Sequence, residues 1–367
     1  MRILQLVTKR QYRGAEVFAA ELSSELAKKG HLITYAGLYA PPDIELIAKN
    51  CTNIDIGGSK MFINLLLLWR VVRLVRKIRP DIVQANGSDT LKYAVLAKYF
   101  IPGMKIFYRN ISMVSAWSQS GSIKRKFNSF LFKRVDFVTS VGQKSLNDLI
   151  NAYRFPVERT KLIKRGIPKI EINKKSARTE LSNLFGYNYA DKVLVHVGNF
   201  SPEKNHPFLV EVFKKVVAKE PDTRLIFMGE GAWLDMIKKS CQKLSNHVFF
   251  VGLNTNVQKF IAGCDVFILG STVEGVPGVI LEAAMQNVPS VAVNVGGVSE
   301  VVLDGITGLL VQEHNSTLFA DAVLKLLEND VLIRRMGDNA RNLIAENYSL
   351  ISCANQFEEL YNSVSKN

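Results

Sequence analysis

Short apolar runs alternate with longer amphipathic stretches along most of the chain. The first run covers residues 2–7, and the stretch 15–29 behind it repeats apolar side chains every three to four positions until Gly30. That spacing predicts a buried strand, a turn and a helix that ends at a glycine. Further runs follow at residues 32–36, 81–84, 105–108 and 137–141, with helical stretches such as 62–78 and 90–100 between them. Short buried strands that alternate with helices are typical of an α/β fold with a parallel, doubly wound sheet.

The alternation stops and then restarts in the middle of the chain. Pro168 and the polar runs 173–176 and 186–189 interrupt it, and we expect a connection between two domains there. The restarted pattern has apolar runs or helical stretches at residues 193–197, 208–219, 224–228, 248–251, 266–269 and 290–293. A second sheet of the same type is therefore predicted.

The two patterns predict two Rossmann-like domains with doubly wound parallel sheets, facing each other across a cleft. The N-terminal domain is expected over residues 1–172 and the C-terminal domain over residues 173–345. A helix over 346–367 is expected to pack back toward the N-terminal domain. Ligands of such sheets bind at the carboxyl ends of the strands, so the loops of both domains should line the cleft.

Composition narrows the class of protein. The 367 residues are 47% hydrophobic, which excludes a disordered chain, and the four cysteines lie far apart without a Cys-x-x-Cys pair. A zinc cluster or a disulfide scaffold is therefore not expected. The first apolar run is too short for a secretory signal, and no run reaches the roughly 18 residues of a membrane span. We expect a cytoplasmic protein.

Charge divides unequally between the two halves. Residues 1–175 contain 31 Lys and Arg against 12 Asp and Glu, whereas the remaining residues contain 16 against 21, for a net charge of +14. A split of this size indicates that the two domains meet different partners, and that the first meets something anionic. General solubility is the alternative explanation, although it does not require the excess to lie in one half.

The chemistry is concentrated in residues 271–286. Glu274 and Glu282 lie on either side of Pro277 and Gly278, where a turn opens a helix after the strand predicted at 266–269. Backbone amides at such a start, those of Val276, Gly278, Val279 and Ile280, are unbonded and suit an anion. A carboxylate one turn into the helix can bind a ribose diol. The alternative is a capped helix with a surface glutamate.

Polar loops after the neighbouring strands add to this pattern. Asn199 and Lys204 follow the first strand of the second domain, where phosphate-binding loops lie, and Lys204 could serve a diphosphate. The alternative reading of Lys204 is an ordinary surface lysine. Gly229 ends the strand predicted at 224–228 with a turn suited to a ligand.

The order of the motifs resembles glycosyltransferase family 4, the retaining, sugar-nucleotide-dependent transferases with the GT-B fold. The resemblance covers nearly the whole chain and rests on RGAE, VGNFSPEKNH, FMGEG, STVEGVPGVILEA, GGVSEVV and DGITGLLV. It implies that the N-terminal domain, residues 1–172, binds the acceptor and that the C-terminal domain, residues 173–345, binds the nucleotide sugar. It also implies that Glu274 contacts the donor sugar and that Glu282 holds the ribose hydroxyls. It further implies that Lys204 steadies the donor diphosphate and that the amide of Gly14 approaches it. Pro277, Gly278 and Val279 correspond to the helix start beneath the phosphates.

Two positions depart from the family pattern. Asn199 stands where the family often has arginine, and Arg109-Asn110 stands where a histidine loop is usual. Arg109 is therefore a candidate for the missing cation. The donor-binding set is predicted as Gly14, Asn199, Lys204, Gly229, Val276, Pro277, Gly278, Val279 and Glu282.

Charge placement indicates a metal-free reaction. Bond cleavage leaves negative charge on the diphosphate, and the sequence has no Asp-x-Asp motif to hold a metal against it. Glu274, Lys204 and Arg109 are the predicted catalytic residues, with no metal and no cofactor. The expected reaction moves a sugar from a UDP- or GDP-sugar to a glycan, in polysaccharide or glycolipid synthesis. A GT-B sugar-nucleotide epimerase and a non-catalytic, membrane-associated nucleotide-sugar-binding subunit are the alternatives.

Basic residues interleave with apolar ones at two places in the first half. The first group is Trp69, Arg70, Arg73 and Lys77, and the second is Lys124, Arg125 and Lys126, which follows a Ser-rich segment at 118–122 expected to be mobile. This pattern suits anionic lipid headgroups, so we expect a peripheral position on the inner face of the cytoplasmic membrane and a lipid-linked acceptor. The alternative for the first group is a core helix with a solvated basic face. The chain has no nucleic-acid-binding signature, and no nucleic-acid partner is expected.

Overall fold

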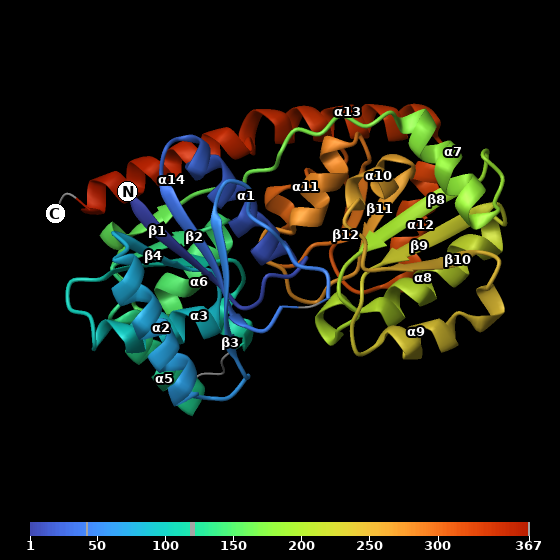
Figure 1. The fold of residues 1–367 in the computed structure, drawn as a ribbon. Coiled ribbons are helices and arrows are strands. Elements are labelled where there is room, and N and C mark those ends of the chain that lie inside the picture. The colour runs from blue at the N-terminus through green and yellow to red at the C-terminus, as the bar shows by residue number, and fades with distance from the viewer. Residues whose placement is uncertain (42, 118–121, 366–367) are drawn as a thin grey trace. The chain divides into compact units, whose positions relative to one another are not determined.

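The computed structural model describes residues 1–41, 43–117 and 122–365. It divides into two compact units, each with its own sheet (Figure 1). Unit 1 consists of Met1–Pro168 and Tyr348–Asn367, and unit 2 of Lys169–Asn347.

Unit 1 contains a seven-stranded sheet in which every neighbouring pair is parallel. Its strands are β1 (Arg2–Val7), β2 (Leu32–Tyr39), β3 (Thr52–Gly58), β4 (Ile82–Ala85), β5 (Lys105–Asn110), β6 (Phe137–Ser140) and β7 (Thr160–Leu162). The spatial order is β3-β2-β1-β4-β5-β6-β7, so the winding direction reverses between β1 and β4. Crossover connections of this kind need helices on both faces.

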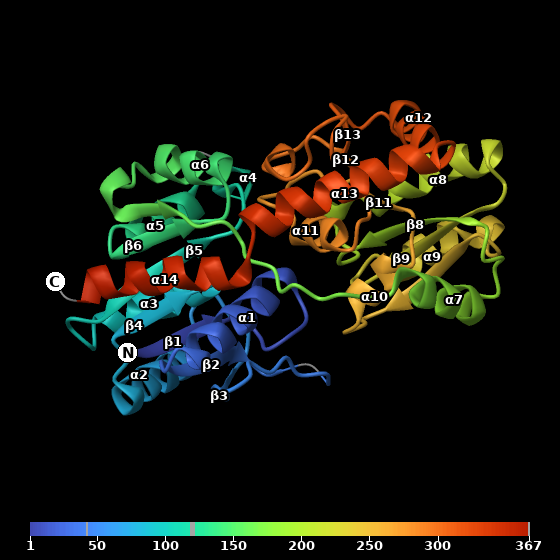
Figure 2. The ribbon, with the colours of Figure 1, turned by 90° about the horizontal axis from the view of Figure 1, so that it is seen from above.

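Helices cover both faces of the unit 1 sheet. They are α1 (Gly14–Lys28), α2 (Leu65–Ile78), α3 (Ser88–Lys98), α4 (Val114–Trp117), α5 (Ile123–Phe132), α6 (Gln143–Tyr153), the short η1 (Val157–Arg159) and, from the end of the chain, α14 (Leu350–Ser365). Successive strand residues serve opposite faces: Leu4 packs in the core with α2, α3 and α5, whereas Ile3 packs with α1 and α14. Helix α14 lies against α1 (Figure 2).

Unit 2 repeats the architecture with six parallel strands. These are β8 (Lys192–Val197), β9 (Thr223–Met228), β10 (Val248–Gly252), β11 (Val266–Leu269), β12 (Ser290–Val293) and β13 (Gly308–Val311). The order β10-β9-β8-β11-β12-β13 reverses between β8 and β11.

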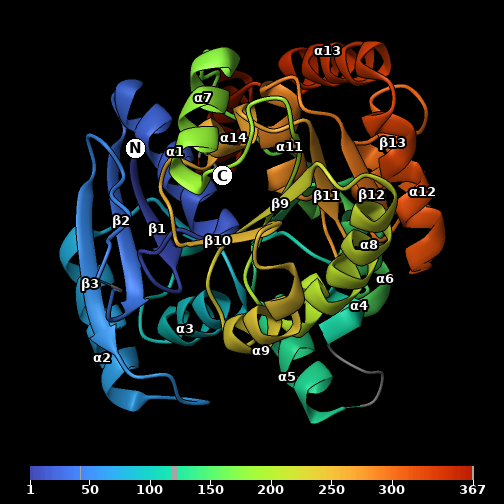
Figure 3. The same ribbon diagram turned by 90° about the vertical axis from the view of Figure 1, so that its right-hand side faces the viewer.

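The helices of unit 2 also take both faces of its sheet. They are α7 (Lys174–Phe185), η2 (Pro202–Lys204), α8 (His206–Lys219), α9 (Leu234–Ser240), η3 (Gln242–Leu244), α10 (Val257–Ala262), α11 (Gly278–Met285), η4 (Val298–Glu300), α12 (Ser316–Leu327) and α13 (Asp330–Asn347). Helices α8 and α12 pack side by side over one face, around the buried side chains of Phe213 and Phe319 (Figure 3).

The structure confirms the predicted α/β class and corrects several details of it. The polar run expected to be a connection is the start of α7, because the Asn173 side chain accepts a hydrogen bond from the amide of Ser176 and caps the helix. Strands β3, β7 and β13 were not predicted. Strands β7 and β13 are short, and β3 mixes its β-branched residues with polar ones and two glycines, so tertiary pairing contributes more than local preference to all three.

No helix within the described residues is both long and apolar enough to cross a membrane. Of the segment at 118–122 that was expected to be mobile, residues 118–121 lie outside the described part of the chain.

Candidate functional site

The predicted donor residues of unit 2 gather where β8 and β11 lie side by side. Ligands of doubly wound sheets bind at such a reversal of strand order. Lys204 lies in the loop after β8 and Glu274 in the loop after β11, and the Lys204 Nζ–Glu274 Oε1 distance is 2.6 Å. The Glu274 side chain is 10% exposed and that of Lys204 is 22% exposed. The structure therefore joins two residues to which the sequence assigned separate contacts with the donor.

Glycines allow the surrounding loops to approach each other closely. A Cβ on Gly229 would lie 2.1 Å from the carbonyl oxygen of Gly198, beside the amide of Asn199, and Gly229 also has a φ of +135°. A Cβ on Gly296, at a φ of +53°, would lie 1.9 Å from the carbonyl oxygen of Glu274. The motif that contains Gly296 thus supports the Glu274 loop, a role that the sequence did not reveal because the two are distant along the chain.

Helix α11 begins at Gly278, with Pro277 at the N-cap position. The sequence predicted Pro277 as the first helical residue, one position further in. It also predicted an unbonded amide at Ile280, and this was wrong, because that amide donates to the Pro277 carbonyl at 3.1 Å. Glu282 is half-buried in the second turn, as predicted from its spacing, whereas Val276 is only 8% exposed and Val279 is half-buried. A helix of eight residues thus starts directly after the Glu274 loop, with its positive dipole end there.

Two buried histidines flank the Lys204 loop, one on β8 before it and one at the start of α8 after it. His196 and His206 are both fully buried, and their rings meet edge to face with centroids 4.8 Å apart. The His206 ring also stacks on Phe200 at 4.0 Å. Burial, with a smaller effect of Lys204, lowers the pKa of His206 to about 4, and burial lowers that of His196 well below its usual value. Both rings are therefore neutral near pH 7, and they leave Lys204 as the cation of this loop.

In unit 1, the predicted residues Gly14 and Arg109 lie at the carboxyl edge of the sheet. Gly14 begins α1, and Arg109 near the end of β5 stacks on Phe18 of that helix at 3.8 Å. Glu16 and Arg165, which had no assigned role, are buried in the same cluster. Only the three-dimensional structure shows this cluster, because its members come from three separate segments.

The predicted basic surface of unit 1 is formed by α2 and α5. Trp69 is 56% exposed and Arg73 stacks on it at 5.4 Å, while Lys77, Lys124 and Lys126 are exposed. Two predicted members are anchored to the backbone instead. Arg70 donates to the carbonyl of Gly57 at 2.6 Å, and Arg125 donates to that of Ala152 at 2.9 Å.

Exposed apolar side chains accompany these cations. They are Met61, Phe62, Leu65 and Leu66 at the start of α2 and Ile123 and Phe130 on α5. The rings of Phe62 and Phe127 lie 5.3 Å apart, so the two groups are neighbours on one surface. We call this set, together with Trp69, Arg73, Lys77, Lys124 and Lys126, the basic–aromatic surface.

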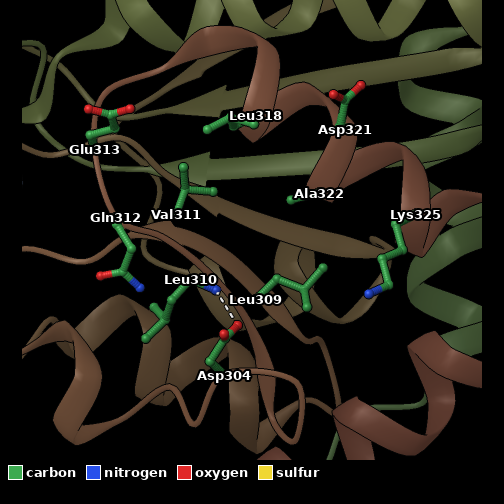
Figure 4. Close-up of a pocket in the computed structure, with 10 residues that line it drawn as sticks. All are labelled: Asp304, Leu309, Leu310, Val311, Gln312, Glu313, Leu318, Asp321, Ala322 and Lys325. Atoms are coloured by element: carbon green, nitrogen blue, oxygen red, sulfur yellow. Dashed lines mark hydrogen bonds between the residues drawn. The ribbon is translucent and has the colours of Figure 1, made fainter.

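A pocket of about 570 Å³ in unit 2 is formed by β13, α12 and Asp304 (Figure 4). Asp304 accepts a hydrogen bond from the amide of Leu310 at 2.9 Å and so closes part of the free edge of the sheet. None of the predicted site residues lines this pocket. Over residues 1–41, 43–117 and 122–365, no group of three or more His, Cys, Asp or Glu side chains is arranged to hold a metal ion.

Comparison with solved structures shows which fold the chain has. The chain superimposes on an Anabaena protein, Alr3699/HepE, solved in complex with UDP and glucose, with a TM-score of 0.84 at 21% identity, over 99% of this chain and 100% of the other. It also matches sucrose-phosphate synthase from Thermosynechococcus elongatus, with a TM-score of 0.81 at 19% identity, over 99% of this chain and 98% of the other. Two parallel-sheet units and these neighbours confirm the predicted GT-B fold.

Family models then specify the group. Residues 12–169 match the model described as Glycosyltransferase Family 4, and residues 178–343 match Glycosyl transferases group 1. The chain belongs to the family 4 glycosyltransferases of the GT-B fold, as its motifs predicted.

Several curated proteins that are similar in sequence to this chain are named for the transfer of a sugar. The N-acetyl-alpha-D-glucosaminyl L-malate synthase of Bacillus anthracis is 26% identical over 96% of this chain and 94% of its own length. The poly(ribitol-phosphate) alpha-N-acetylglucosaminyltransferase of Staphylococcus aureus is 32% identical, over 47% of this chain and 36% of its own. The UDP-Gal:alpha-D-GlcNAc-diphosphoundecaprenol alpha-1,3-galactosyltransferase of Escherichia coli is 26% identical over 46% and 45%.

Proposed function

We propose that this glycosyltransferase moves a hexose from a UDP- or GDP-sugar to a lipid-linked glycan acceptor, with retention of the anomeric configuration and without a metal. The observation that carries the proposal is the Lys204–Glu274 pair beside the start of α11. A cation, a carboxylate and a helix N-terminus at the reversal of strand order suit a ligand with a diphosphate and a hydroxylated sugar.

Lys204 and Glu274 can bind different parts of the donor. Phosphate oxygens would compete with Glu274 for the ammonium group of Lys204, because they carry more negative charge than one carboxylate. Glu274 would then be released to accept hydrogen bonds from sugar hydroxyls. The exchange couples recognition of the diphosphate to recognition of the sugar.

Electrostatics would supply the rate enhancement. As the glycosidic bond breaks, negative charge grows on the diphosphate and positive charge on the sugar ring. Lys204 and the dipole of α11 oppose the first charge, and Arg109 is the candidate for a further cation. Attack from the face that the diphosphate leaves would retain the configuration, with a departing phosphate oxygen taking the proton of the acceptor hydroxyl.

Names of relatives support the substrate classes. The Anabaena protein is solved with UDP and glucose, and the Escherichia coli relative is named for a UDP-sugar donor and a diphosphoundecaprenol acceptor. The basic–aromatic surface supports a peripheral position on an acidic membrane, such as the negatively charged cytoplasmic leaflet.

A panel of UDP- and GDP-sugars, read by thermal shift and then by turnover, tests the proposal. We expect one donor class to stabilise the wild-type protein and Lys204→Ala and Glu274→Ala each to weaken this effect. Lys219→Ala is the matched control, because Lys219 forms a more exposed ion pair with Asp321 on α8 and α12 of the same unit. Donor binding without turnover on any glycan acceptor, or conversion of the donor to its C2 epimer, would contradict the proposal.

A further inference from the structure

A carboxylate held by two buried side chains lies at the carboxyl edge of the unit 1 sheet. Asp89 is in the first turn of α3, which follows β4, and the strand order reverses between β1 and β4. The Oδ2 atom of Asp89 accepts a hydrogen bond from the Tyr39 hydroxyl at 3.2 Å, and its Oδ1 atom lies 3.1 Å from Nζ of Lys92. Ligands of doubly wound sheets bind at such a reversal, so the position of Asp89 suits a ligand of unit 1.

Both partners of Asp89 are buried, whereas part of the carboxylate remains exposed. Tyr39 is 3% exposed and Lys92 is 6% exposed, but the Asp89 side chain is 25% exposed. Burial, with a smaller effect of Asp89, raises the pKa of the Tyr39 hydroxyl, so this hydroxyl keeps its proton and donates it to the carboxylate. The orientation of Asp89 is therefore fixed from inside the protein. Because a carboxylate has about four acceptor positions, its exposed part can accept further hydrogen bonds from a ligand.

A second acceptor beside Asp89 has no donor. Asn86, between β4 and α3, is 4% exposed, and its Nδ2 atom donates to Gln5 Oε1 at 2.9 Å and to a β1 carbonyl at 3.2 Å. These two bonds fix which end of the amide is the nitrogen, and no described residue donates to its Oδ1 atom. The backbone between Asn86 and Asp89 is uncrowded: apart from its chain neighbours, a Cβ on Gly87 would meet no atom nearer than Thr8 Oγ1 at 3.7 Å. Two oxygen acceptors at this place suit the hydroxyl donors of a glycan.

Lys92 also connects Asp89 with the basic–aromatic surface. Its Nζ atom donates to the carbonyl of Met61 at 3.4 Å and lies 5.9 Å from the centre of the Phe62 ring. The side chains of Met61 and Phe62 are exposed. One buried lysine thus holds both a carboxylate that suits hydroxyl groups and a segment that suits a hydrocarbon chain. A lipid-linked glycan carries these two chemical parts side by side.

We propose that Asp89 binds hydroxyl groups of the acceptor sugar, with Tyr39 and Lys92 as its positioning residues. This inference rests on the proposed function and names the residue of unit 1 that recognises the acceptor, whereas Lys204 and Glu274 of unit 2 serve the donor. A carboxylate can accept hydrogen bonds from two adjacent hydroxyls of a sugar ring. Such bonds to a charged group are about twice as strong as those between neutral groups, so the loss of the charge should be measurable.

Octyl glucoside and octyl N-acetylglucosaminide are the acceptor probes, each tested with the donor that the thermal-shift panel identifies. We expect Asp89→Asn to raise the KM for the acceptor about tenfold or more, and to leave the KM for the donor and the rate of donor hydrolysis by water within about twofold of wild type. Asp89→Glu keeps the charge and should recover part of the loss. Asp136→Asn is the matched control: the Asp136 side chain is also 25% exposed and pairs with Lys98 of the same helix, but it lies before β6, at the amino ends of the strands.

A double variant separates acceptor binding from stability. Asp89→Asn leaves the buried ammonium group of Lys92 without its carboxylate, which by itself can lower the amount of folded enzyme. Asp89→Asn/Lys92→Met removes both charges, and we expect it to recover stability but not the wild-type KM for the acceptor. Recovery of that KM in the double variant would show that Asp89 only pairs with Lys92, and would overturn the inference. Equal increases in the KM values for donor and acceptor would overturn it as well.

Direct binding of the acceptor probe gives a result even without turnover. In saturation-transfer NMR, octyl N-acetylglucosaminide should bind to the wild-type protein and at least several-fold more weakly to Asp89→Asn. Equal binding by the two proteins, or no binding by wild type, would overturn the inference. Failure of the proposed function would instead appear as absence of UDP- or GDP-sugar binding in the thermal-shift panel, which the NMR measurement does not require.

Discussion

Lys204 and Glu274 are 70 residues apart in the sequence and 2.6 Å apart in the structure. They meet because β8 and β11, which precede their loops, are neighbours at the point where the strand order reverses. Gly229, after β9, and Gly296, after β12, let their loops approach these two loops closely, so the pair is part of a packed edge of the sheet. It is the centre of the donor site that we propose.

Lys204 and Glu274 should depend on each other in their contributions to the free energy of unfolding, as well as in donor binding. Lys204→Met leaves the nearly buried Glu274 carboxylate without its partner, and we expect a loss of roughly 1–3 kcal/mol in the free energy of unfolding. The double variant Lys204→Met/Glu274→Gln should lose less than the sum of the single variants. Urea unfolding of the four proteins of this cycle measures the coupling, and strict additivity would mean that the ion pair does not form in solution.

The two residues of the Lys204–Glu274 pair should also contribute differently to donor affinity. Lys204→Met should weaken UDP binding at least about tenfold, whereas Glu274→Gln should affect UDP little and the complete UDP-sugar strongly. The difference arises because UDP has the diphosphate but no sugar. Calorimetry measures the affinity of each variant for UDP and for the UDP-sugar. If both substitutions weaken UDP binding equally, Lys204 and Glu274 do not have the separate roles that we propose.

Activity should survive removal of divalent metals. Lys204 and the helix dipole of α11 supply positive charge to the leaving group, so kcat in EDTA should stay within about twofold of its value in Mg²⁺. Initial rates in both buffers check this, with a metal-dependent transferase as the positive control. Complete loss of activity in EDTA, restored by Mg²⁺ or Mn²⁺, would disprove the metal-free mechanism.

Vesicle binding should depend on the basic–aromatic surface. We expect the protein to sediment with vesicles of acidic phospholipid and far less with zwitterionic ones, because the surface combines exposed cations with exposed apolar side chains. The double variant Leu65→Ser/Trp69→Ser should bind at least several-fold more weakly, since it removes the apolar part of the contact. Lys243→Ser on unit 2 serves as a surface control. Equal sedimentation with both lipid types at about 0.15 M salt would contradict a headgroup-specific interaction.

Stability should rise with pH through the range in which His206 would titrate in the unfolded chain. Burial lowers its pKa to about 4 from a usual value near 6.5, so the unfolded chain binds the proton more readily between these values. Its contribution is complete above about pH 6.5 and falls by about 1.4 kcal/mol for each unit of pH below that, down to about pH 4. Urea midpoints at pH 7.5 and pH 5.5 should differ more for wild type than for His206→Gln. An identical pH response of the two proteins would show that His206 is accessible to protons in the folded state.

The sequence predicted the classes of element and their repetition well. Strong β-branched runs such as 266–269 became strands with the predicted bounds, because a parallel sheet buried on both faces leaves a continuous apolar run in the sequence. The motifs also predicted the family, which the two family models confirm. Helix α7 was not predicted because its apolar face is narrow and its first turn is polar. The capping role of Asn173 becomes evident only once the helix itself is known.

Pairing between distant segments was decided by the tertiary structure alone. Local sequence determines whether a segment is helical or extended. It placed Lys204 and Glu274 on loops at strand ends and Gly278 at the start of a helix. The order of strands in the sheet then decides which loops become neighbours, and it joined Lys204 to Glu274. Burial acts in the same non-local way: Arg109 is an ordinary arginine in the sequence, and it becomes an unsatisfied cation only because α1 and α14 close over the sheet around it. Electrostatic character depends on surroundings that the chain assembles from separate segments, and that is why only the fold could reveal it.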